Sequence, residues 1–133
     1  IIEKQAVNVV QPDVCHCGGI LQTLKIAAMA ENYYISVAPH NPLGPVALAA
    51  CLQIDTCIPN FTAQEHPTHE EKLDLGNGLF KEPFVIKDGY IDVPQRRGLG
   101  FERDEYAVKE LSYDGKWSNP ILYHEDDNSL GEW

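Results

Sequence analysis

The fold is decided by residues 11–65, which read QPDVCHCGGILQTLKIAAMAENYYISVAPHNPLGPVALAACLQIDTCIPNFTAQE. Three polar residues, Asp13, His40 and Glu65, each stand just after a short apolar run. Successive members are about 25 to 27 residues apart, close to the roughly 30 residues that a strand and its return helix occupy in a (β/α) barrel. We therefore expect the three residues at the same end of three successive parallel strands, as part of an active site.

Three segments have the composition of β-strands. Residues 6–10, 34–38 and 61–64 are rich in β-branched or aromatic side chains, which favour extended backbone. Pro12 follows the first segment and Pro39 the second, and proline cannot donate to a strand ladder. The first two strands are therefore expected to end just before the first two polar residues.

Helical patterns separate these strands. Within residues 18–33, Ile20 and Ala27 belong to an apolar stripe at helical spacing. Residues 46–56 are apolar almost all round, as in a helix buried against its neighbours, and Pro45 suits the first turn of that helix. Strands that alternate with helices at this spacing run parallel and are joined by right-handed crossovers.

Three parallel strands alone leave sheet edges and faces uncovered, which parallel sheets rarely tolerate. The chain also begins without methionine, so we expect it to be a piece of a longer protein whose missing part lies upstream. A flavodoxin-like sheet is the structural alternative. It should place a phosphate-binding turn at a helix N-terminus, and Gly18-Gly19 alone is weak evidence for one.

The pattern changes after Glu65, where a polar loop precedes a different arrangement of residues. Two β-rich runs flank Asp88-Gly89, a strong signal for a tight hairpin, and residues 102–111 predict a short helix. We therefore divide the chain into residues 1–75, the barrel part, and residues 76–133, an α+β segment with a tail.

Composition narrows the class of protein. The 133 residues are 44% hydrophobic and 23% charged, as in one globular domain, and no apolar run is long enough to span a membrane. The net charge of −10 disfavours nucleic acid as a partner. The four cysteines, with no secretory signal, favour reduced thiols and a cytoplasmic location.

The motifs QPDVCHCGGI (11–20), APHNPLGP (38–45) and QE (64–65), with the Asp88-Gly89 hairpin and GLG (98–100), resemble the C-terminal part of the enolase superfamily. The nearest subgroup is that of the mandelate-racemase-like sugar-acid dehydratases, in particular those acting on galactonate. The resemblance covers nearly the whole chain in order. It implies strands six to eight of a TIM-type (β/α) barrel, followed by a segment of an α+β capping domain.

The resemblance also implies a reaction. The whole protein would dehydrate an aldonic acid of the galactonate type to a 2-keto-3-deoxy acid through an enediolate, with Mg²⁺ as cofactor, and would form a homo-oligomer. His40 would be the general base, Asp13 would pair with it, and Glu65 would hydrogen-bond the enediolate. The Mg²⁺ ligands would come from upstream segments, so the 133 residues alone are expected to be inactive.

Two further histidines are candidates for substrate contact. His16 either lines the site or bonds a loop carbonyl, and His66 lies in a polar loop with His69 at the expected mouth of the barrel. Cys15 and Cys17 flank His16 too closely for one tetrahedral metal ion.

Three other functions stay open at this point. The enolase superfamily also contains racemases, epimerases and cycloisomerases, which differ in the fate of the enediolate. The chain could also be a non-catalytic truncated remnant that acts as an interaction module. A small zinc protein using the cysteines with His66 and His69 is the third alternative.

Overall fold

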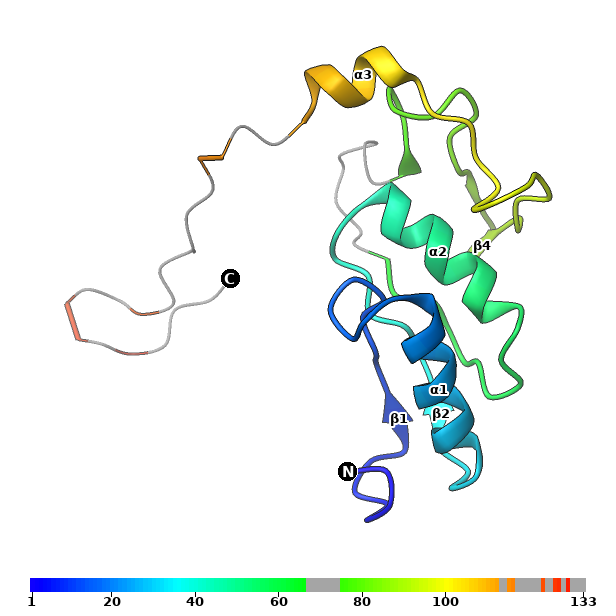
Figure 1. The fold of residues 1–133 in the computed structure, drawn as a ribbon. Helices are drawn as coiled ribbons and strands as arrows, with labels where there is room; N and C mark the ends of the chain where they lie inside the picture. Colours follow the sequence, from blue (N-terminus) through cyan, green and yellow to red (C-terminus); the bar gives the residue numbers. More distant parts are fainter. Residues whose placement is uncertain (67–74, 113–114, 117–122, 124–125, 128, 130–133) are drawn as a thin grey trace.

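The computed structural model describes residues 1–66, 75–112, 115–116, 123, 126–127 and 129. These residues form two two-stranded sheets and three helices. Figure 1 shows the parallel sheet and α1 at one end and the hairpin and α3 at the other. In chain order the elements are β1 (Val9–Val10), α1 (Ile20–Glu31), β2 (Ser36–Val37), α2 (Pro45–Asp55), β3 (Ile86–Lys87), β4 (Tyr90–Ile91) and α3 (Glu105–Glu110).

The first sheet is parallel, as the alternation of strands and helices predicts. β1 and β2 pair in the register Val9 with Ser36 and Val10 with Val37. A third segment joins on the other side of β2 through a parallel bridge between Val37 and Phe61. The three segments therefore lie side by side in chain order, like successive strands of a (β/α) barrel.

The third expected strand, over residues 61–64, is reduced to this bridge. The Val37 amide donates to the Asn60 carbonyl at 2.8 Å, and the Thr62 amide donates to the Val37 carbonyl at 2.9 Å. The regular ladder stops there because the next donor, beyond the end of β2, would be Pro39, which has no N–H. The other two strands are also shorter than predicted.

The helix α1 begins two residues later than predicted because Gly18 and Gly19 have φ of 108° and 89°, outside the helical region. Its most buried positions are Thr23, Ala27 and Ala30. Ile20, which the apolar stripe predicted to be buried, is 41% exposed. The buried stripe of α1 is therefore narrower and more polar than the sequence pattern indicated.

The helix α2 joins two hydrophobic clusters. Ala47, Ala50, Cys51 and Ile54 belong to a first cluster with side chains of α1 and β2. Leu48, Ala49 and Leu52 belong to a second cluster with Phe80 and Phe84. Figure 1 shows α2 between α1 and the hairpin accordingly. Its burial on both sides confirms the prediction of an apolar, buried helix that starts at Pro45.

The hairpin of β3 and β4 has the predicted turn. Ile86 pairs with Ile91 and Lys87 with Tyr90, and the two turn residues Asp88 and Gly89 have φ of 51° and 82°. Positive φ at both central residues is the type I′ pattern that Asp-Gly favours. The helix predicted over 102–111 is shorter, because Asp104 caps it by accepting from the Tyr106 and Ala107 amides.

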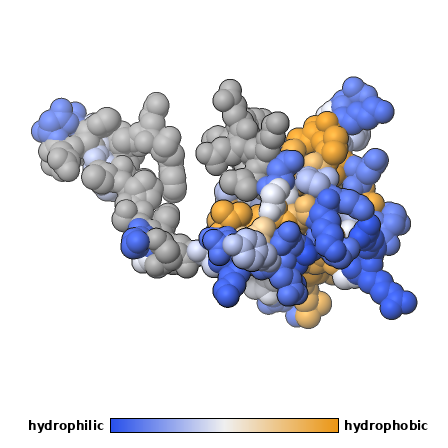
Figure 2. Space-filling view, turned by 90° about the horizontal axis from the view of Figure 1, so that it is seen from above, coloured by the Kyte–Doolittle hydropathy of each residue, from blue (hydrophilic) through white to orange (hydrophobic). Residues whose placement is uncertain are grey.

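Figure 2 shows one face, on which hydrophobic side chains gather in several patches between hydrophilic ones. Within the described residues, no helix has the length and apolar character needed to cross a bilayer.

Candidate functional site

The backbone brings Asp13 and His40 together at the carboxyl ends of β1 and β2. The two residues form a parallel bridge, and the His40 amide donates to the Pro12 carbonyl at 3.2 Å. Paired residues on neighbouring parallel strands are about 5 Å apart and project to the same side. The expected position of both groups at one edge of the sheet is therefore present.

The side chain of His40 contacts Glu65, not Asp13. Its Nδ1 lies within hydrogen-bond distance of Glu65 Oε2, although 25 residues separate the two in the chain. The side chains are 43% and 40% exposed, so both face solvent at the edge of the sheet. Among the hydrogen bonds of the described residues none joins the side chains of Asp13 and His40, so the expected dyad is not formed here.

The carboxylate of Asp13 is occupied within its own turn. Its Oδ1 accepts from the Cys15 amide at 2.7 Å and from the His16 amide at 3.2 Å, a local turn that aspartate commonly forms. Its Oδ2 lies 3.0 Å from His16 Nδ1 without hydrogen-bond geometry, and is buried with no hydrogen-bond partner in the described part. Asp13 is 8% exposed, so one of its oxygens remains a buried acceptor in a residue whose backbone pairs with that of His40.

The two histidines proposed for substrate contact lie differently. The ring of His16 is 69% exposed, and its Nδ1 lies 3.0 Å from Asp13 Oδ2. His66 is half-buried, and its Nδ1 has no hydrogen-bond partner among the described residues. His69 lies outside the described residues.

A residue that the sequence patterns did not single out is Gln64. Its Nε2 donates to the Pro39 carbonyl at 3.0 Å and to the Glu65 carbonyl at 2.6 Å. The only signal in the sequence is its place before Glu65 in the QE motif. Gln64 links the backbone on both sides of the contact between His40 and Glu65.

All four cysteines are free thiols that form no disulfide. Burial, followed by the negative charge of Asp13, raises the pKa of Cys15, and burial with the nearby Asp55 raises the pKa of Cys51 to about 12. A raised pKa disfavours the thiolate that binds metals and attacks electrophiles.

No group of three or more metal-ligating side chains comes together within the part of the chain that the structure describes. The described residues therefore do not fit a Mg²⁺ site, and we assign no step of the chemistry to a metal bound by them. Nor do Cys15 and Cys17 find the further ligands that a structural zinc site requires within these residues.

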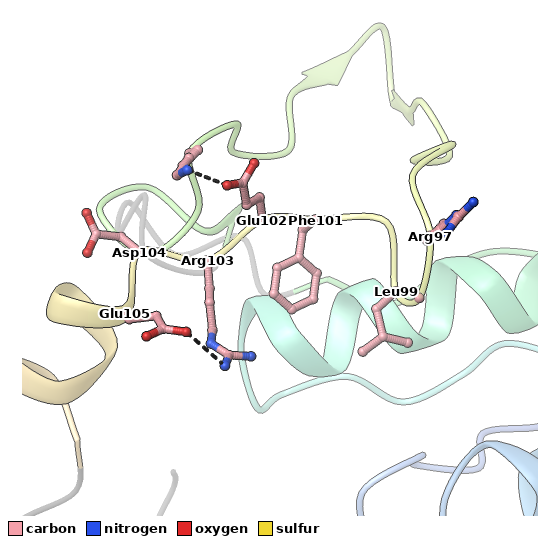
Figure 3. A pocket seen from close by; sticks show the side chains of 9 residues that line it. Arg97, Leu99, Phe101, Glu102, Arg103, Asp104 and Glu105 are labelled. Atoms are coloured by element: carbon pink, nitrogen blue, oxygen red, sulfur yellow. Dashed lines mark hydrogen bonds and ion pairs between the residues drawn. The ribbon is translucent and has the colours of Figure 1, made fainter.

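A cavity in the described part of the chain lies elsewhere. It has a volume of about 770 Å³ and is lined by residues 97–99 and 101–105 with Lys81. Figure 3 shows Leu99 and Phe101 turned toward α2, with the pairs Lys81–Glu102 and Arg103–Glu105 nearby. Its charged side chains largely neutralise one another, and it contains none of the residues at the carboxyl ends of β1 and β2.

Comparison with known proteins identifies the family. Residues 1–107 match the model of the "Enolase C-terminal domain-like" family. A D-galactonate dehydratase of Ralstonia pickettii is 43% identical over 140 aligned residues, which cover all of this chain and 36% of that protein. The chain therefore spans about a third of the length of this relative.

Solved structures agree with this assignment. A crystal structure of an enolase from Agrobacterium radiobacter, with bound sodium and L-malate, has a TM-score of 0.80 and 29% identity over 97% of this chain and 35% of that one. An enolase from Pantoea ananatis with bound D-gluconate and magnesium has a TM-score of 0.74 and 25% identity over 86% of this chain and 27% of that one. The three parallel segments and their two helices thus correspond to part of a TIM barrel like that of these proteins. The chain belongs to the enolase C-terminal domain-like family.

Proposed function

We propose that this chain forms the base-bearing part of an active site that dehydrates a sugar acid of the galactonate type. The product would be a 2-keto-3-deoxy acid. The observation that carries the proposal is the meeting of His40 with Glu65, and of His40 with Asp13 through the backbone, at the carboxyl ends of parallel segments. In (β/α) barrels the catalytic residues come from this end of several strands.

In the proposed reaction His40 removes the proton from the carbon next to the carboxylate. The contact at Nδ1 leaves Nε2 free to face the substrate. The electron pair of the broken C–H bond forms an enediolate with the carboxylate, and its return expels the β-hydroxyl group, which leaves as water with a proton from an acid in the rest of the intact protein. The resulting enol takes up a proton to give the keto acid. General base catalysis of this kind typically contributes about 10²–10⁴-fold.

We assign the two carboxylates different roles. Asp13 would accept a hydrogen bond from Nδ1–H of His40 when substrate is bound and so stabilise the imidazolium, because its buried Oδ2 lacks a hydrogen-bond partner among the described residues and its backbone pairs with that of His40. Glu65 would then hydrogen-bond the enediolate. Such a change requires the imidazole to leave Glu65, and the half-exposed environment of both side chains leaves room for that rotation. His16 and His66 would contact the substrate.

The substrate class is supported by the relatives. The Ralstonia pickettii protein is named D-galactonate dehydratase, and the Pantoea ananatis structure contains D-gluconate, also a sugar acid. Mg²⁺ enters the proposal for the whole protein on the same basis, since the latter structure also contains magnesium. A divalent ion would lower the cost of placing charge on the enediolate. The described residues do not build its site.

The test uses the intact protein with D-galactonate and Mg²⁺ in deuterated solvent. The wild-type protein should release a 2-keto-3-deoxy acid that carries deuterium at C3, because the enol takes its last proton from solvent. His40→Asn should lose both dehydration and the exchange of the C2 proton while it keeps its thermal unfolding transition. Exchange retained in His40→Asn would contradict the base assignment. Exchange at C2 without dehydration in the wild type would indicate a racemase or epimerase instead.

A further inference from the structure

We propose that Gln64 is a positioning residue that holds the His40 and Glu65 backbones in register where the strand ladder has ended. The mechanical part of this inference depends only on the contacts of Gln64, and its effect on turnover rests on the proposed function. Gln64 need not touch the substrate in this role.

The need for such a residue arises from Pro39. In the parallel pairing, Val37 bonds the third segment through its N–H and its C=O. The next residue after β2 that faces this segment is Pro39, whose missing N–H prevents continuation of the ladder. Beyond Thr62, the backbone hydrogen bonds of the described residues include none between these two segments.

The side chain of Gln64 replaces the missing ladder. In a regular parallel ladder the Pro39 carbonyl would accept from the backbone amide of Gln64. Here it accepts from Gln64 Nε2 at 3.0 Å, and the Glu65 carbonyl accepts from the same nitrogen at 2.6 Å. The Pro39 carbonyl belongs to the peptide bond that leads into His40. One amide group thus fixes the backbone next to both members of the His40–Glu65 contact.

The network also determines the orientation of the amide. An NH₂ group has two protons to donate, and both carbonyls need a donor, so nitrogen and not oxygen must face them. The remaining atom, Gln64 Oε1, is buried with no hydrogen-bond partner among the described residues. A buried unsatisfied acceptor is unfavourable for stability. An apolar side chain would remove this acceptor but would leave the Pro39 and Glu65 carbonyls without the Gln64 donor.

Two substitutions test whether the two amide donors of Gln64 are needed. Gln64→Met keeps the length of the side chain and removes both donors. Gln64→Glu places a carboxylate against two carbonyls, and only its protonated form can donate one hydrogen bond. A matched control exists in Gln53, whose Nε2 donates to the Pro94 carbonyl at 3.5 Å far from the candidate site. Gln53→Met makes the same chemical change at a second proline carbonyl.

In the intact protein we expect Gln64→Met to lower kcat about 10–100-fold, because small misplacements of reacting groups have effects of this size, with KM changed less than about threefold. The imidazole nitrogen signals of His40, measured by NMR and assigned with His40→Asn, should shift in Gln64→Met and stay unchanged in Gln53→Met. The activity of Gln64→Glu relative to Gln64→Met should rise as the pH falls and the glutamic acid becomes protonated.

The outcomes are distinguishable. Unchanged His40 signals in Gln64→Met overturn the inference, whether or not kcat falls. Shifted signals in a protein whose wild type does not dehydrate a sugar acid would contradict the proposed function but leave the positioning role supported. If Gln64→Met does not fold, the same signals compared between Gln64→Glu at low and high pH decide the question, since a pH-independent difference from wild type would overturn the inference.

Discussion

The imidazole of His40 contacts Glu65 through Nδ1 and Oε2, while its backbone is paired with that of Asp13. His40 therefore stands between two carboxylates that reach it in different ways. Glu65 lies at solvent, whereas Asp13 is 8% exposed and holds the turn that follows β1. The carboxylate that His40 contacts without substrate need not be the one that assists it during proton transfer.

The first prediction separates these two carboxylates. In the substrate-free protein Glu65→Gln should shift the imidazole nitrogen signals of His40, because it removes the charge beside Nδ1. Asp13→Asn should leave these signals nearly unchanged, since the Asn side-chain oxygen can still accept from the Cys15 amide. With a non-reacting sugar-acid analogue bound, Asp13→Asn should instead shift the His40 signals, and Glu65→Gln should leave them nearly unchanged. If Glu65→Gln alone shifts the His40 signals, both without and with the analogue, the proposed role of Asp13 is contradicted.

A second prediction concerns Gly100, which passes close to Pro94. A Cβ at this position would lie 2.4 Å from Pro94 Cβ and 3.1 Å from its carbonyl oxygen, and φ is +85°. Gly98 has φ of +71° and no atom within 4 Å of a built Cβ. We expect Gly98→Ala to lower the free energy of unfolding by about 1 kcal/mol and Gly100→Ala by about 3 kcal/mol. Urea unfolding of both variants measures the difference. Equal losses of unfolding free energy in the two variants would show that Pro94 moves away from the added Cβ at no energetic cost.

A third prediction concerns the helix that links the two clusters. Leu48 is fully buried on α2 against Phe80 and Phe84. Leu48→Ala should therefore lower the free energy of unfolding by about 2–5 kcal/mol through lost contacts and a residual cavity. Leu21 on α1 is 65% exposed, so Leu21→Ala should change it by less than about 0.5 kcal/mol. Similar losses in the two variants would contradict the packing of the second cluster on α2.

The sequence predicts much of the fold because its signals are local. Pro45 at a helix start, Asp88-Gly89 in a hairpin and β-rich runs before Pro12 and Pro39 each restrict a few backbone angles, and the structure has all of them in place. The strands are shorter than the sequence predicts because the number of ladder bonds depends on the partner strand. The third segment shows this most clearly, since the ladder ends where Pro39 has no amide to donate.

The arrangement of side chains in the site could not be predicted in the same way. Asp13 can bond the amides of its own turn or an imidazole, and the choice depends on which geometry is available in three dimensions. The spacing of Asp13, His40 and Glu65 predicted only that they share one edge of the sheet. The role of Gln64 depends on a carbonyl 25 residues away that no local pattern reveals.

The last prediction follows from Asp55, the final residue of α2. Both of its carboxylate oxygens are buried without a hydrogen-bond partner in the described part. Burial raises the pKa of Asp55 from 3.8 to about 7. Because the folded-state pKa lies above the unfolded one, the folded chain binds the proton more tightly. The resulting stabilisation is complete below about pH 4 and is lost as the pH rises to about 7.

Asp55→Asn is therefore expected to stabilise the chain at pH 8 and to have little effect near pH 4. The two pKa values correspond to about 4 kcal/mol for a group sealed from water, and the partial exposure of Asp55 reduces the expected gain at pH 8 to about 1–2 kcal/mol. Urea unfolding at both pH values measures it, with the exposed Asp92→Asn as a control for the loss of one negative charge. An equal gain in both variants at pH 8 would attribute the effect to the net charge of −10 and not to the burial of Asp55.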